Sequence, residues 1–95
     1  MKVDRDKTAR LDRASQTAMQ GERFRMFLSD PGIVAFFDAY EKDAMSALLK
    51  CQPTDDDGRR AAALKINAMR DLRSFLSAAI ASGDQASETL KRENT

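Results

Sequence analysis

The sequence predicts an all-α protein in which an antiparallel helical hairpin is closed by a shorter N-terminal helix, as in a three-helix bundle. Ala is abundant, whereas Val and Ile are scarce, and no stretch alternates apolar and polar residues in the manner of a half-buried strand. The two prolines and four glycines cut the 95 residues into segments of helical length. Within those segments, the apolar residues recur at the spacing of a helix face.

The second segment carries the clearest start and stop signals. Asp30 is suited to cap a helix, and Pro31 fits the first helical position because no hydrogen bond is lost there. The residue before Pro53 is disfavoured from the α region, so the helix should end close to Cys51. These signals predict a helix over 31–51.

A third segment should form a longer helix, over 55–82. Thr54 is a suitable N-cap, and the carboxylates of Asp55, Asp56 and Asp57 complement the positive end of the helix dipole. Gly83 is expected to end this helix in the left-handed conformation. Because the connection after the second segment is short, the two helices should lie antiparallel.

The N-terminal segment is less apolar than the other two. Residues 4–20 read as a helix with a weak apolar stripe, and we expect a break or bend near Gly21, after which 22–29 packs on the hairpin. The predicted organisation is therefore a basic helical arm over 1–20, a hairpin core over 21–83 and a polar, frayed tail over 84–95. All six aromatic side chains should pack in the core where the helices meet: Phe24, Phe27, Phe36, Phe37, Tyr40 and Phe75.

The apolar surface of the two long helices exceeds what the hairpin alone can cover. In the third segment the apolar residues span an arc of roughly 200°, whereas packing on one neighbour needs about 100°. A protein interface is therefore predicted, through which the chain forms a homo-oligomer or docks on a larger protein. The alternative is that helix 4–20 folds back over this side in a monomer. The predicted interface consists of Val34, Met45, Leu49, Met69, Leu76 and Ile80.

Residues suited to catalysis are scarce. The chain has no His and one Cys, so neither a Cys–His pair nor a Ser–His–Asp triad can be assembled. Asp55, Asp57 and Gly58 resemble part of a calcium loop, but Pro53 and Leu64 occupy its first and last ligand positions, so helix capping explains the carboxylates better. We therefore expect no enzymatic activity, no cofactor and no metal.

Charge and hydropathy limit the cellular compartments and the classes of partner that the sequence allows. The charged start has no apolar run behind it and no segment is long enough to span a bilayer, so the cytosol of the producing cell is the expected compartment, with no membrane partner. The net charge of +1 is low for a protein that coats DNA. Residues 1–25 carry seven basic and four acidic side chains, whereas 26–58 carry two and seven.

Two other functions remain open. A nucleic-acid-contacting accessory protein would use the basic N-terminal residues, and its binding would weaken steeply with salt. A small inhibitor of a host enzyme would use the acidic surface around Asp38, Glu41 and Asp43. The possible nucleic-acid contacts are Arg5, Lys7, Arg10 and Arg13.

The layout of residues 24–83 resembles the small helical proteins encoded among the head and DNA-packaging genes of tailed bacteriophages and prophages. The features that carry it are the 27–31 junction Phe-Leu-Ser-Asp-Pro, the pair Phe36-Phe37, the 53–57 turn Pro-Thr-Asp-Asp-Asp and the long helix ending at 80–83. The resemblance implies a structural or assembly role, in a host cell or a virion. It assigns no functional residue.

Overall fold

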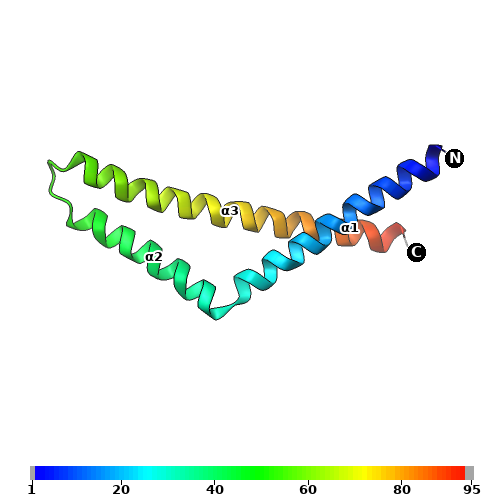
Figure 1. The fold of residues 1–95 in the computed structure, drawn as a ribbon, viewed down its shortest axis with the longest axis horizontal. Coiled ribbons are helices and arrows are strands. Elements are labelled where there is room, and N and C mark those ends of the chain that lie inside the picture. Colours follow the sequence, from blue (N-terminus) through cyan, green and yellow to red (C-terminus); the bar gives the residue numbers. More distant parts are fainter. Residues whose placement is uncertain (1, 94–95) are drawn as a thin grey trace. The chain divides into compact units, whose positions relative to one another are not determined.

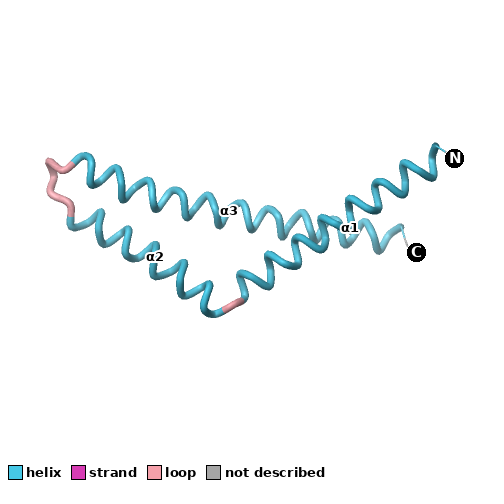
Figure 2. The backbone as a smooth tube through the Cα atoms, viewed as in Figure 1, coloured by secondary structure: helices cyan, strands magenta, loops and turns pink. Residues whose placement is uncertain are grey.

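A computed structural model describes residues 2–93, which form three helices and no strand (Figures 1 and 2). The helices are α1 (Lys2–Ser29), α2 (Pro31–Lys50) and α3 (Asp56–Glu93). The predicted all-α fold class is confirmed.

The ends of α2 are those that the sequence predicts. The Asp30 carboxylate accepts a hydrogen bond from the backbone N–H of Gly32 at 2.8 Å, and Pro31 occupies the first turn. At the other end, the N–H of Cys51 donates to the carbonyl of Leu48 at 3.3 Å. Both ends are therefore satisfied locally, and the helix needs no other element to define its length.

The start of α3 differs from the prediction by one residue. Asp55, rather than Thr54, caps the helix, because its carboxylate accepts the N–H of Gly58 at 2.9 Å and its carbonyl accepts the N–H of Arg59 at 3.1 Å. Asp is among the strongest capping residues and ranks above Thr. The two carboxylates that follow, Asp56 and Asp57, lie in the first turn, where they complement the helix dipole.

No break occurs at Gly21, and the predicted helix end at Gly83 is wrong. Helix α1 runs through Gly21, α3 runs through Gly83 to Glu93, and no described residue has a positive φ. Both glycines are buried and face each other, so that a Cβ built on Gly21 would lie 2.8 Å from the Cα of Gly83. They are retained inside helices because the backbones of α1 and α3 approach too closely there for any side chain.

The chain divides into two compact units. In the first, α1 as far as Phe27 packs with α3 from Leu76 onward. The two segments are antiparallel, since Lys7 pairs with Glu93 at 3.6 Å while Arg25 pairs with Asp84. The polar C-terminal segment, expected to fray, is thus helical as far as Glu93 and paired with α1.

The second unit, Leu28–Phe75, contains the predicted antiparallel hairpin of α2 and the first half of α3. Its buried residues are Phe37, Ala44, Ala62, Ile66 and Met69.

In each unit, one narrow side of α3 is turned toward the neighbouring helix, and we call the positions on these sides the inner face. Its positions alternate in steps of four and three residues, and every one is buried or half-buried. Within each unit, this heptad spacing keeps a narrow face of the helix directed at its neighbour. The inner face consists of Ala62, Ile66, Met69, Arg73, Leu76, Ile80, Gly83, Ser87 and Leu90.

Candidate functional site

The hairpin unit exposes more large apolar side chains than it buries. Its buried set is small and includes two alanines, Ala44 and Ala62. Two helices cannot enclose a core on all sides, so apolar residues beyond the mutual contact face water. The exposed set in this unit is Val34, Phe36, Tyr40, Met45, Leu49, Leu64, Leu72 and Phe75.

The predicted interface residues separate into two groups. Leu49 is 81% exposed, and Val34 and Met45 are each 42% exposed, so these three are accessible on α2. Met69 and Leu76 are 7% and 5% exposed, so they are buried within the chain and do not present an accessible surface to a partner. Both belong to the inner face, which the chain covers by itself.

Ile80, the sixth predicted interface residue, is half-buried on the same inner face. Other residues of the first unit therefore cover part of its side chain.

The aromatic residues do not form the predicted core. Phe37 is buried at 7% exposure, whereas Phe36 and Phe75 are 58% and 65% exposed. The ring centroid of Phe36 lies 6.0 Å from that of Phe37 and 6.2 Å from that of Tyr40. The three aromatic side chains of α2 thus extend from the buried Phe37 to the exposed Phe36 and Tyr40.

The exposed apolar residues of α3 lie along a second stripe, beside the inner face. We call this stripe the outer seam, and it contains two leucines, one phenylalanine and two alanines, all exposed. Successive positions are separated by three, four, four and three residues, a spacing that places them on one side of a helix. The outer seam consists of Ala61, Leu64, Ala68, Leu72 and Phe75.

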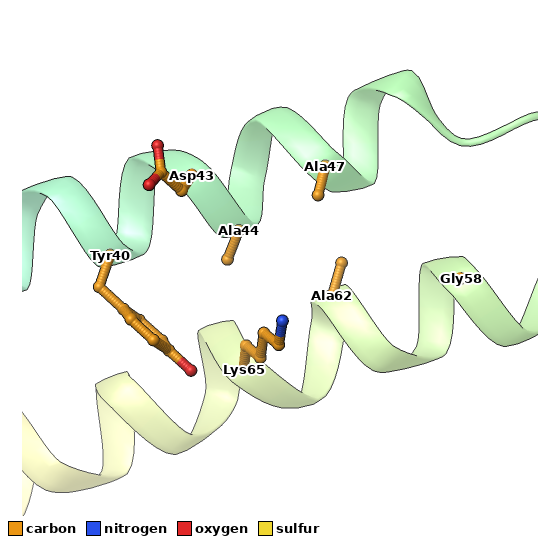
Figure 3. A pocket seen from close by; sticks show the side chains of 7 residues that line it. All are labelled: Tyr40, Asp43, Ala44, Ala47, Gly58, Ala62 and Lys65. Carbon is orange, nitrogen blue, oxygen red and sulfur yellow. The ribbon is translucent and has the colours of Figure 1, made fainter.

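An open pocket between α2 and α3 borders this side of the hairpin. Figure 3 shows the Tyr40 side chain reaching from α2 toward α3, with Lys65 on the facing helix. Small residues leave the space open, since Ala44 and Ala47 of α2 lie opposite Ala62. The polar side chains that line it are those of Tyr40, Asp43 and Lys65.

On the inner face, Arg73 occupies a position where an apolar residue would be usual. Its guanidinium lies 5.6 Å from the centroid of the Phe37 ring, 3.1 Å from the Asp38 carboxylate and 3.5 Å from that of Glu41. Its Nε is buried without a hydrogen-bond partner. Two carboxylates of the acidic surface that an inhibitor would use are thus paired with Arg73 inside the chain, while Asp43 lines the pocket of Figure 3.

The basic N-terminal residues Arg5, Lys7, Arg10 and Arg13 are all exposed on α1. Lys7 is paired with Glu93. At about 100° per residue, Arg5 and Lys7 project to nearly opposite sides of the helix, so the four cations do not form one narrow stripe.

Further along α1, Arg25 is exposed and contacts Asp84 and Glu22. The hydrogen bond and the charge of Asp84, with a smaller contribution from Glu22, raise the pKa of Arg25 further above neutrality. The guanidinium is therefore charged at neutral pH.

Reactive groups are few in the described part of the chain. The Cys51 thiol donates to the carbonyl of Ala47 at 3.2 Å. Residues 2–93 contain no group of three or more side chains that could hold a metal ion. Among the same residues, no helix combines the length and apolarity needed to cross a bilayer.

Comparisons with protein-family models, with curated proteins and with solved structures find no match for this chain.

Proposed function

We propose that this chain is a non-enzymatic assembly module that associates with copies of itself through the apolar surface of the hairpin unit. The observation that carries the proposal is the excess of exposed over buried large apolar side chains in residues 28–75. Soluble monomers rarely leave contiguous apolar patches of more than a few hundred Å² in water. Such patches are typical of surfaces that meet another protein.

The energetics favour association. Burying one Leu or Phe side chain fully is favourable by about 1.5–3 kcal/mol. Leu49, Leu64 and Phe75 each have more than 60% of their surface exposed, at 81%, 62% and 65%. Association costs roughly 4–15 kcal/mol in lost freedom of motion, so a contact that buries several such residues per copy can be stable, whereas one that buries a single residue cannot.

The composition supports a non-catalytic role, because the usual general base, His, is absent from the chain. The resemblance of residues 24–83 to small helical phage proteins offers a setting for such a module, namely the assembly of a virion head.

The test is the molar mass in solution, measured by light scattering over a range of protein concentrations. A self-associating module gives a mass of at least twice 10.6 kDa, falling on dilution. A mass that stays at the monomer value at every concentration would refute the proposal. Adding a DNA duplex at two salt concentrations tests the nucleic-acid alternative, because binding through Arg5, Lys7, Arg10 and Arg13 would weaken steeply at the higher salt.

A further inference from the structure

We infer that the outer seam is the self-association contact, and that α3 pairs antiparallel with α3 of a second copy about a two-fold axis at Ala68. The inference deepens the proposed function and rests on it. The outer seam, residues 61–75, lies wholly in the second unit, so the contact requires only residues of that unit.

The spacing of the outer seam is the first reason for a second copy as the occupant. Its steps of three, four, four and three residues are the same read in either direction from Ala68. In a two-fold contact, residue i of one copy meets residue j of the other, and j meets i. A stripe that reads alike in both directions meets this condition when two identical helices run antiparallel.

The sizes of the side chains fit the same register. Leu64 comes level with Leu72 of the second copy, and the small Ala61 comes level with the large Phe75. Ala68 comes level with its own copy, where a small residue lets two helices approach closely. The large Phe75 side chain therefore packs over the small Ala61, and the two leucines pack against each other. Such pairing allows the side chains of the two helices to interdigitate.

The charges along α3 are compatible with this register. Lys65 and Asp71 lie three residues on either side of Ala68, so the lysine of one copy comes level with the aspartate of the other. Every other charged residue between Asp56 and Arg73 comes level with an uncharged one. The pairing thus brings no like charges level, and like-charge contacts are a common means of excluding a partner.

The hairpin unit as a whole exposes enough apolar area for a stable dimer, and the outer seam supplies more than half of it. A fully exposed Phe or Tyr presents on the order of 200 Å². With exposures of 62%, 42% and 65% for Leu64, Leu72 and Phe75, the outer seam offers roughly 300 Å² of apolar area per copy. Phe36 and Tyr40 of the same unit, 58% and 39% exposed, raise the exposed apolar area of the unit to roughly 500 Å². A standard interface buries about 800 Å² per partner, of which somewhat over half is apolar.

The exposed apolar residues of α2 form a poorer seam. Between Val34 and Met45, the same side of α2 carries Asp38 and Lys42, so charged groups interrupt the stripe. The outer seam has no such interruption from Ala61 to Phe75, because Lys65 and Asp71 lie at its borders.

Disulfide trapping tests the register directly. In a Cys51→Ser background, Ala68→Cys places a thiol on the two-fold axis, whereas Phe75→Cys places the two thiols about 21 Å apart in an antiparallel pair. Asn67→Cys is the matched control, since residue 67 is exposed, adjacent in sequence and turned away from the seam. Under mild oxidation, Ala68→Cys should give a covalent dimer on a non-reducing gel, and the other two variants should give little.

Other outcomes overturn the inference in distinguishable ways. Efficient cross-linking of both Ala68→Cys and Phe75→Cys would indicate parallel helices. No cross-link at 68, in a protein whose mass is that of a dimer, would place self-association elsewhere and leave the proposed function intact. A monomeric mass for the unmodified chain would refute the proposed function itself.

A charge at the axis provides an independent readout. Ala68→Arg brings two like charges together across the interface and should weaken self-association by about tenfold or more. Asn67→Arg should leave it unchanged. Circular dichroism is expected to show equal helicity in both variants, because residues 67 and 68 are exposed in the single chain. Unchanged association of Ala68→Arg would contradict the inference.

Discussion

Replacing Gly83 by Ala should destabilise the first unit, although the same change stabilises an ordinary helix. A Cβ on Gly83 would lie 2.9 Å from the Cα of Gly21 and 3.2 Å from the carbonyl oxygen of Thr17. Both are backbone atoms, so no side chain can turn aside to make room. The helices α1 and α3 must instead separate.

The magnitude follows from two opposing effects. Ala is favoured over Gly inside a helix by about 1 kcal/mol. Carbon atoms normally pack at about 3.5–4.0 Å, so α1 and α3 must move apart by the better part of 1 Å. Inserting a methyl group into a packed contact costs about 1–3 kcal/mol, and more where only backbone can yield. We expect a net loss of about 1 kcal/mol, which lowers the Tm of a domain this size by about 4–8 °C.

The assay is thermal unfolding followed by circular dichroism. Ser82→Ala is the matched control, because Ser82 is exposed beside Gly83 and gains helix propensity without approaching α1. The double variant Gly21→Ala/Gly83→Ala should cost less than the sum of the single changes, since the helices have already separated once the first methyl group is present. A rise in Tm for Gly83→Ala comparable with that of the control would show that the two helices do not cross closely at this point.

Three further changes probe other contacts. Asp30→Ala removes the carboxylate that accepts the N–H of Gly32 and should lower the free energy of unfolding by about 1 kcal/mol. Asp30→Asn should retain most of the stability, because Asn also caps helices. Equal urea midpoints for the two variants would argue against the cap. Leu49→Glu, at a site 81% exposed, should leave the urea midpoint nearly unchanged, whereas Met69→Glu, at a site 7% exposed, should unfold much of the protein. Arg73→Met should be close to neutral, because it removes the buried Nε along with the ion pairs, while Arg73→Ala should lower the midpoint by losing packing on Phe37 as well.

The boundaries that could be predicted from sequence are those set by local chemistry. The Asp30-Pro31 start and the end before Pro53 depend on hydrogen bonds and sterics within a few residues, and the structure has both where they were expected. The sequence predicts Thr54 as the cap where the structure has Asp55, because several residues able to cap a helix follow one another there and only the backbone geometry selects among them.

The roles of Gly21 and Gly83 depend on tertiary contacts. A glycine within a helical pattern can end the helix in the left-handed conformation, or it can allow another backbone to approach closely. A single sequence does not distinguish these two roles. The choice depends on whether a residue far away in the chain is also small. Gly21 and Gly83 are 62 positions apart, and only their meeting explains both.

The apolar residues of α3 show the same division. The sequence alone determined that this helix carries an apolar arc about twice as wide as one neighbour covers. Tertiary structure decided which part of the arc is inner face and which is outer seam, so that Met69 and Leu76 are buried while Leu64 and Phe75 are exposed. Helical periodicity fixes the angle between two residues on one helix, but only packing against a second helix fixes which angle points inward.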